Sequence, residues 1–321
     1  TYQNKLKEVL AGVNTDWKVR PIRVGVGQKH SLYVEGGDKD MLYGVNLAYN
    51  NIEGVMKGSS RNTFSGGVTL SYRVKNFSFR NKLTIDYNTA DNSPWGRFPQ
   101  YCMMNPYSRL YDEDGNLIKS YTYYTGAGQA AQFSNPIYNT MLNTKDNSTY
   151  TDLTNNFYAE WQALEHLRFT ARFGIVRRLT TSDVFKPANH TDFVDVSDPF
   201  LKGSYIKGNG AHTDITGELG ANYSIELNKH LIFFNAQFSM TDNSYNTTTV
   251  RAQGFPNDFM DDIAFAVGYE KDGSPTSVEG ISRTIGGIGS VNYSYDNRYL
   301  FDANLRYSGS SEAGRDHRWH A

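Results

Sequence analysis

Apolar and polar residues alternate with a period of two along most of this chain. In residues 61–74 the apolar positions fall on one face of an extended strand, while Thr, Ser and Arg fall on the other. Residues 77–87 repeat the alternation after a short turn at Lys75-Asn76. The pattern predicts β-strands that each have one apolar and one polar face.

The same hairpin pattern recurs along the chain and predicts about ten antiparallel strands. The paired segments are 28–35 with 41–50, 61–74 with 77–87, 153–164 with 167–181, 213–227 with 231–244, and 283–295 with 299–309. The first residues differ, because Leu6, Val9, Leu10 and Val13 have helical spacing before Pro21. A short helix is therefore expected at the start.

Strand length and loop length distinguish a membrane β-barrel from a soluble β-sandwich. Many of the predicted strands run to about 12–15 residues, whereas strands of globular proteins usually have about 5–6. One end of the hairpins has tight turns, and the other has long connections at 51–61, 91–150, 183–212 and 246–282. Bacterial outer-membrane barrels combine long tilted strands with short periplasmic turns and long outer loops. The expected fold class is all-β, a partial antiparallel up-and-down transmembrane β-barrel of about ten strands.

The composition agrees with a barrel, and it argues against a nucleic-acid-binding protein and against a disulfide-linked domain. The chain has 23 Tyr, 18 Phe and 29 Gly, yet its mean hydropathy is only -0.57. Barrel strands have low mean hydropathy because lipid-facing and lumen-facing residues alternate. The net charge of -1 gives no basic surface for nucleic acid. The single Cys102 cannot form an internal disulfide.

In a barrel, the alternation predicts which side chains face lipid and which face the lumen. The apolar set expected to point outward is Phe64, Val68, Leu70, Phe79, Leu83, Ile85, Phe234 and Phe238. The charged set expected to point inward is Arg80, Lys82, Glu218 and Arg306.

Residues 14–64 carry the most specific motif of the chain. Thr15-Asp16-Trp17 is followed by Gln28-Lys29-His30-Ser31-Leu32, by Gly36-Gly37, and by Tyr43, Tyr49, Glu53-Gly54 and Lys57. Residues 296–319 form a second motif. In order and spacing, the chain resembles the SusC/RagA family of TonB-linked outer-membrane proteins. It departs from the family's second motif at Ala313, where an aromatic residue is usual, and at Ser308, where Asp is common.

The resemblance implies a 22-stranded barrel with an N-terminal plug, located in the cell outer membrane. It implies TonB-dependent import of nutrients, most often oligosaccharides and in some members peptides, with a SusD-like lipoprotein as a lid. TonB would act through an N-terminal region, and the barrel would contact membrane lipid and lipopolysaccharide. The chain is then expected to be a barrel fragment. Residues 1–21 would be a lead-in from the plug, and residues 22–321 the partial barrel with outer loops 91–150, 183–212 and 246–282.

The sequence contains no recognisable catalytic motif, so neither an enzyme nor a cofactor or metal site is expected. HExxH, GxSxG, P-loop and CxxC patterns are all missing. Residues 112–116 superficially resemble a calcium loop but lack its 12-residue spacing. An Asp-Gly turn inside a long loop is the better interpretation, and Asp272-Gly273 is expected to be another.

The long loop 91–150 is the candidate site for contact with cargo or lid. Its rings could offer apolar faces to sugars, with amides nearby for hydroxyl groups. The candidates are Trp95, Tyr101, Tyr107, Tyr111, Tyr121, Tyr123 and Tyr124. The alternative is that these rings pack within the loop or against the lid. Two rival functions also remain open, an outer-membrane barrel enzyme and a soluble carbohydrate-binding β-protein.

Overall fold

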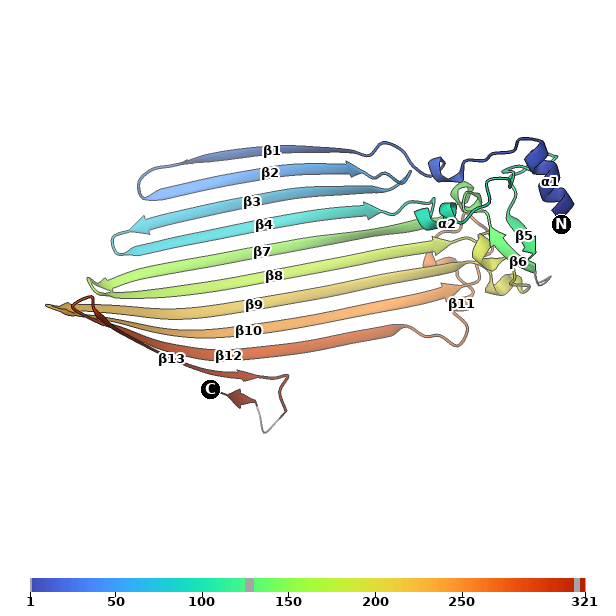
Figure 1. Ribbon diagram of the computed structural model, residues 1–321. Helices are drawn as coiled ribbons and strands as arrows, with labels where there is room; N and C mark the ends of the chain where they lie inside the picture. Colours follow the sequence, from blue (N-terminus) through green and yellow to red (C-terminus); the bar gives the residue numbers. More distant parts are fainter. Residues whose placement is uncertain (1, 125–129, 315–317, 321) are drawn as a thin grey trace.

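A computed structural model describes residues 2–124, 130–314 and 318–320, and its main feature is a single long antiparallel sheet (Figure 1). The chain begins with the expected helix, α1 (Tyr2–Leu10), and a 3-10 turn, η1 (Trp17–Val19). Ten long strands follow: β1 (Val26–Gly37), β2 (Met41–Glu53), β3 (Ser60–Val74), β4 (Phe77–Asp91), β7 (Lys145–Leu164), β8 (Leu167–Lys186), β9 (Ser204–Leu227), β10 (His230–Gln253), β12 (Thr276–Tyr295) and β13 (Tyr299–Ser310).

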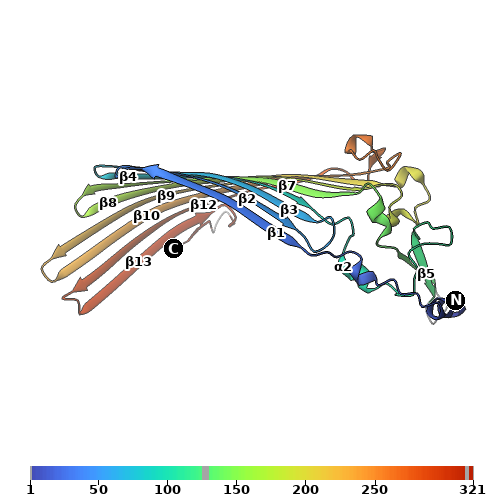
Figure 2. The same ribbon diagram turned by 90° about the horizontal axis from the view of Figure 1, so that it is seen from above.

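Each long strand pairs with the next long strand along the chain, as the hairpin pattern predicted. The short strands β11 (Gly268–Tyr269) and β14 (Trp319–His320) add to β10 and β13. β4 pairs directly with β7, because β5 (Ser120–Tyr124) and β6 (Ala130–Ser134) form a separate hairpin within the intervening connection. Figure 2 shows the sheet curving from β1 to β13. Within the described residues, no second sheet packs face to face on it, which excludes a soluble sandwich.

Neighbouring hairpins from β1 to β10 are staggered along the sheet, whereas the turn after β12 lies level with the turn before β10. Phe77 begins β4 opposite Trp161, but β7 continues to Leu164 before it turns. Likewise Leu167 begins β8 opposite Tyr223, and β9 continues to Leu227. A cumulative stagger of this kind is the shear that strands need when they tilt against a barrel axis. The tight turns lie at one end of the sheet and the long connections at the other, as the sequence predicted (Figure 1).

The register places the two predicted sets of side chains on opposite faces. Arg80 pairs with Tyr158, Tyr158 with Arg172, and Arg172 with Glu218, so these residues share one face. Arg306 lies on the same face through Ile288 and Gln237. The apolar set occupies the other face, for example through the pairs Val68–Leu83 and Tyr72–Phe79. The predicted alternation is confirmed, and the apolar face is the one suited to lipid.

The apolar face has the height of a bilayer core. On β4 it runs from Phe77 to Tyr87, interrupted by Asn81, and then changes to Thr89. These ten residue steps cover about 33 Å along the strand, or about 25 Å along the membrane normal at a tilt near 40°. On β10 the same face changes from Met240 to Asp242. β10 therefore leaves the hydrocarbon region well before it ends at Gln253, and β4 leaves it shortly before Asp91.

Aromatic rings gather on the apolar face near the tight turns. Phe77 stacks on Trp161 with ring centroids 5.5 Å apart, and Trp161 stacks on Phe169 at the same distance. Farther along the sheet, Tyr295 and Tyr299 approach within 6.4 Å beside their own turn. Amphipathic rings favour the membrane interface. This row therefore marks the boundary of the apolar band at the end with the tight turns.

Strands β7 to β12 extend farther than the alternation predicted. β9 and β10 each have 24 residues, and β7, β8 and β12 each have 20. Their outer parts carry polar residues on both faces, so the period-two signal disappears although strand pairing continues. The connections are correspondingly shorter than expected, at 92–144, 187–203 and 254–275.

Among the described residues, none of the helices has the length and apolar character that would let it cross a membrane.

A charge placed on the apolar face should destabilise the sheet in a bilayer. Leu83→Lys puts an ammonium at the middle of the apolar band of β4, which should lower the free energy of unfolding by about 2–4 kcal/mol. Denaturant titration of the full-length protein that contains this chain, inserted in lipid vesicles, measures the change. The adjacent substitution Thr84→Lys points to the other face and should be nearly neutral. Equal effects of both substitutions would mean that the assignment of faces is wrong.

Candidate functional site

The long connections at the outer end of the sheet form one packed unit, which we call the loop cluster. It comprises residues 2–25, 54–59, 92–124, 130–144, 187–203 and 254–275. Its short elements are α2 (Phe98–Cys102), the β5–β6 hairpin and the 3-10 turns η2 (Tyr138–Met141), η3 (Thr191–Phe193), η4 (Pro199–Leu201) and η5 (Ile263–Phe265). Both clusters of buried apolar residues in the described chain lie at this end.

The first buried cluster joins the start of the chain to the connection 92–144. Trp17 and Tyr101 are 2% and 1% exposed, and Met104 and Ile137 pack against them. Burial raises the pKa of the Tyr101 hydroxyl, which stays protonated and donates to the carbonyl oxygen of Trp95 at 2.8 Å. Large buried rings contribute much of a small core's stability. This cluster therefore fixes the shape of the longest connection.

The Thr15-Asp16-Trp17 motif anchors this core through hydrogen bonds. Trp17 Nε1 donates to the carbonyl of Asn105 at 2.9 Å, and Thr15 Oγ1 donates to the carbonyl of Ser108 at 2.6 Å. Asp16 adopts the left-handed backbone region, with φ 45°, which Asp tolerates better than most residues. The motif thus has a structural role that its sequence did not reveal.

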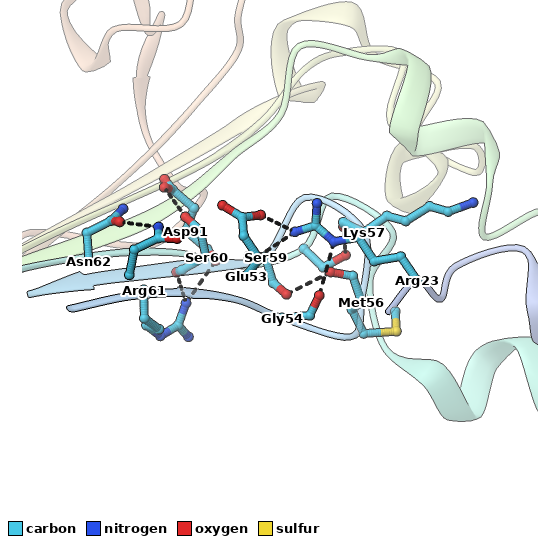
Figure 3. A network of polar contacts seen from close by, with 12 residues as sticks. Arg23, Glu53, Gly54, Met56, Lys57, Ser59, Ser60, Arg61, Asn62 and Asp91 are labelled. Atoms are coloured by element: carbon cyan, nitrogen blue, oxygen red, sulfur yellow. Dashed lines mark hydrogen bonds and ion pairs between the residues drawn. The ribbon is translucent and has the colours of Figure 1, made fainter. Parts of the chain in front are cut away.

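A polar network holds the short connection 54–59, which follows the motif residue Glu53 at the end of β2 and contains the motif residues Gly54 and Lys57 (Figure 3). Arg23 Nη2 donates to Glu53 Oε2 at 2.5 Å, while Arg23 Nε donates to the carbonyl of Gly54 at 3.1 Å. Lys57 Nζ donates to the carbonyl of Arg20 at 2.7 Å and lies 4.9 Å from the centre of the Trp95 ring. These contacts tie the residues before β1 to the first two hairpins.

The second buried cluster caps the ends of β8, β9 and β10. Phe185 is fully buried, and Tyr205 and Phe255 are 3% and 2% exposed. The Phe255 ring meets Phe185 edge-on, with centroids 5.1 Å apart. Because Phe255 belongs to the connection 254–275, this connection is folded back onto the strand ends.

Polar contacts join the three long connections to one another. Asn139 Nδ2 donates to Thr191 Oγ1 at 2.8 Å, which links 92–144 to 187–203. Asn189 Nδ2 donates to Asp258 Oδ2 at 2.8 Å, which links 187–203 to 254–275. Lys145 Nζ lies 2.9 Å from Asp261 Oδ2, and this contact lowers the pKa of the Asp261 carboxyl. Hydrogen bonds and an ion pair therefore join the long connections to one another from β4 to β10.

A cavity of about 1150 Å³ lies within the loop cluster. It opens between the connection 92–144, the connection 187–203 and the outer ends of β7 and β8. Side-chain amides and hydroxyls form much of its lining: Ser59, Asn92, Ser93, Gln100, Gln132, Ser134, Asn139, Thr144 and Thr191. Charged side chains such as Arg97, Lys145 and Asp192 also line it, and apolar groups, such as those of Met103 and Phe133, form about as much of the lining as the polar groups. The lining can donate and accept hydrogen bonds to a neutral, hydroxyl-rich ligand.

The predicted ring residues fall into three groups: rings that pack on the first buried cluster, rings that are exposed, and the half-buried ring of Tyr123. Tyr101 is buried, and Trp95 and Tyr121 pack on the same core, where Tyr121 OH donates to the carbonyl of Arg109 at 2.7 Å. Tyr107 and Tyr111 are 42% and 55% exposed.

Tyr123 is half-buried and stacks on Tyr121 with centroids 6.3 Å apart. Tyr124 lies in β5, but its side chain is outside the described residues. None of the six described rings lines the cavity, whereas Phe133, which was not among the candidates, does.

His190 is buried beside the cavity in its neutral form. Burial lowers the pKa of its imidazole from 6.5 to about 4, against a smaller opposing effect of Asp192. Its Nδ1 accepts a hydrogen bond from the Asp192 amide at 3.1 Å and so caps η3. Asp192 Oδ1 also lies 3.5 Å from this nitrogen. An Nδ1 that accepts the amide hydrogen carries no proton, so this contact is not an ion pair.

The two Asp-Gly segments form turns, as predicted. The Asp112 amide donates to the carbonyl of Asn116 at 2.9 Å, and Gly115 has φ 83°. The Gly273 amide donates to the carbonyl of Glu270 at 2.7 Å. Among the described residues, no three of the types His, Cys, Asp and Glu are grouped as a metal ion would require.

Curated relatives of the chain are TonB-dependent receptors, although no protein-family model matches it. It is 23% identical to the TonB-dependent receptor SusC of Bacteroides thetaiotaomicron, over 98% of this chain and 32% of the receptor. It is also 23% identical to the TonB-dependent receptor P39 of Formosa agariphila, over 92% of this chain and 27% of that protein. The chain thus spans about a third of the length of these relatives.

Solved structures share the fold. The structure of the RagAB peptide transporter matches with a TM-score of 0.77 and 17% identity, over 96% of this chain and 34% of that chain. The ferripyoverdine receptor of the outer membrane of Pseudomonas aeruginosa matches with a TM-score of 0.51 and 12% identity, over 89% and 36%.

The resemblance to the SusC/RagA family is therefore confirmed, as are the partial antiparallel β-barrel fold and the location in the outer membrane. The named relatives are receptors and transporters, which fits a chain that is not an enzyme.

Removal of the Trp17 ring should loosen the loop cluster without disturbing the sheet. Trp17→Ala leaves a cavity in the first core and should destabilise the cluster by about 3–5 kcal/mol. Amide hydrogen exchange should then speed up at residues 101–104 and 137 but not in β4 or β7. Val19→Ala, at a half-exposed position two residues away, is the matched control and should change little. Unchanged exchange at 101–104 in Trp17→Ala would contradict the anchoring role.

The buried His190 should make the η3 turn sensitive to mild acid. Because its folded-state pKa is depressed, its stabilising contribution is complete above pH 6.5 and is lost as the pH falls towards 4. Exchange at residues 191–194, corrected for the intrinsic pH dependence, should therefore increase between pH 7 and pH 5. His190→Asn keeps a capping acceptor but does not titrate, so its exchange should be flat over this range. A flat profile in the wild type would disprove the buried neutral state.

Proposed function

We propose that the chain provides part of the wall and outer mouth of a TonB-dependent importer, which carries nutrients across the outer membrane without covalent chemistry. The observation that carries this proposal is the loop cluster itself. A set of connections joined by hydrogen bonds and ion pairs borders an open cavity, lined by both polar and apolar groups, at the outer end of a transmembrane sheet. The names of the curated relatives support the same role.

The cargo that we propose is an oligosaccharide. The cavity presents amide and hydroxyl groups from Gln100, Gln132, Ser134 and Asn139, which suit sugar hydroxyls. Phe133 supplies a ring face at the cavity for sugar C–H groups. Peptides are the second candidate, because the RagAB structure is named a peptide transporter. The backbone of a peptide could use the same amide and hydroxyl groups.

Tyr107 and Tyr111 are the rings that we assign to contact with a partner. Both belong to the connection 92–144 and are about half exposed, unlike Tyr101. Exposed tyrosines provide contact area at low entropic cost. The partner we propose is a SusD-like lipoprotein that covers the mouth. Tyr101, Trp95 and Tyr121 would act indirectly by holding the connection in shape.

Outside the mouth, the apolar band would contact membrane lipid, and the polar region above it would contact lipopolysaccharide. TonB would act through parts of the receptor that lie beyond these residues. Residues 22–321 are proposed to be barrel, and residues 1–21 a lead-in from a plug. Since Trp17 packs on the connection 92–144 and Glu8 lies 2.5 Å from Arg109, this lead-in would reach the wall at the mouth.

Deletion of the longest connection should abolish recognition of the cargo while the barrel still assembles in the membrane. In the intact receptor, residues 100–144 would be replaced by a short Gly-Ser linker, which leaves the pairing of β4 with β7 intact. Growth on the cognate nutrient should be lost, while heat-modifiable migration and surface labelling should show a normally inserted barrel.

The double substitution Tyr107→Ala and Tyr111→Ala is the finer variant and should weaken co-purification of the lipoprotein. Phe133→Ala should instead reduce uptake with the complex intact. Normal uptake after the deletion would place recognition elsewhere in the receptor. Failure to insert would mean that the connection serves assembly.

A further inference from the structure

A second hollow lies on the polar face of the sheet, nearer the tight turns than the long connections on β4, β7 and β8, and far from the mouth. Its volume is about 620 Å³. It is lined by residues of four adjacent strands, β4, β7, β8 and β9: Arg80, Lys82, Asn156, Phe157, Tyr158, Arg172, Phe173, Gly174, Thr216 and Glu218. By the register, the polar members of this set face the lumen of the barrel.

A glycine opens the floor of this hollow. Gly174 lies in the row Lys82, Asn156, Gly174, Thr216 across the four strands. A Cβ at Gly174 would lie 2.6 Å from Thr216 Oγ1 and 3.3 Å from Asn156 Oδ1. The missing side chain therefore leaves a space that two hydrogen-bonding groups border.

The lining carries excess positive charge. Three of its side chains are basic, Arg80, Lys82 and Arg172, and only Glu218 is acidic. Glu218 Oε2 accepts from Arg172 Nη1 at 3.1 Å, and the Arg172 guanidinium also lies 5.6 Å from the centre of the Tyr158 ring. Arg172 is thus held in place. Within the part of the chain that the structure describes, Arg80 and Lys82 have no acidic partner.

The three basic side chains can converge on one group. Arg80 and Arg172 both pair with Tyr158, from opposite sides, so their backbones lie about 10 Å apart. Lys82 stands two residues from Arg80 on the same face. Long basic side chains at this spacing can contact opposite sides of a small anion, and a guanidinium offers paired N–H donors to a carboxylate.

We propose that this hollow is an anion site that binds a carboxylate group between Arg80, Lys82 and Arg172, with Asn156 and Thr216 as further hydrogen-bond partners. The carboxylate has two possible sources: an acidic side chain of the receptor that lies inside the barrel, or a soluble molecule that passes through it. The site does not depend on the proposed import function, because it belongs to the wall and not to the mouth.

Two measurements on the full-length receptor in detergent distinguish these sources. In the first, a carbodiimide condenses the Lys82 amine with any carboxylate in contact, forming an amide while the carbodiimide takes up water to become a urea. Mass spectrometry then identifies the acidic residue joined to Lys82. In the second, isothermal calorimetry measures binding of succinate, with uncharged succinamide as the control ligand.

Glu160 borders the hollow, because its Oε2 accepts from Tyr158 OH at 2.7 Å. Joining of Lys82 to an acidic residue of the receptor other than Glu160 and Glu218 would assign the site to the receptor's own carboxylate. Saturable binding of succinate but not succinamide would assign it to a soluble one, and R80Q/K82Q should weaken this binding about tenfold or more. K82R keeps the charge and should retain succinate binding. Arg306→Gln lies on the same face outside the hollow and should change neither result.

Absence of both signals would overturn the proposal. So would a cross-link confined to Glu160 or Glu218, or succinate binding that R80Q/K82Q leaves unchanged.

Discussion

The rest of the structure depends on one constraint, the need to satisfy every backbone amide and carbonyl inside a hydrocarbon layer. A wall one strand thick satisfies them only if each strand pairs along its length with both neighbours. Pairing of this kind fixes the pleat, and the pleat sends successive side chains to lipid and to lumen. The apolar band, the aromatic row at its lower edge and the charged inner face all follow from it. Within the described residues, both buried apolar clusters form where the strands rise out of the bilayer.

The same constraint explains which features could be predicted from the sequence. Leu83 and Lys82 must face opposite sides of the wall, so their alternation is visible in the sequence without knowledge of any distant residue. The tight turn at Lys75-Asn76 and the helix around Leu6 and Val9 are also local features. The strand ends were harder to predict. Residues 242–253 of β10 leave the bilayer, so both faces become polar and the periodic signal ends while the pairing continues.

The loop cluster could not be derived in this way, because its contacts join residues far apart in the chain. Trp17 and Asn105 are 88 residues apart, and Asn143 and Asp261 are 118 apart. Composition identified the connection 91–150 as rich in rings, but it could not tell the buried Tyr101 from the exposed Tyr111. The family motif did mark Thr15, Trp17, Glu53 and Lys57. Their role in holding the connections became clear only from their hydrogen bonds.

The length of β9 and β10 has a consequence for what can reach the receptor from outside. From Asp242 to Gln253, β10 rises about 25–30 Å beyond the hydrocarbon edge, given about 3.3 Å per residue and a tilt near 40°. Lipid headgroups occupy only about 5–8 Å on each side of a bilayer. The outer part of β10, and of β9 paired with it, therefore projects beyond the headgroups of the lipid. An antibody, a phage tail or a protease could approach it from the side, and its sequence is exposed to a selection that the buried wall below never meets.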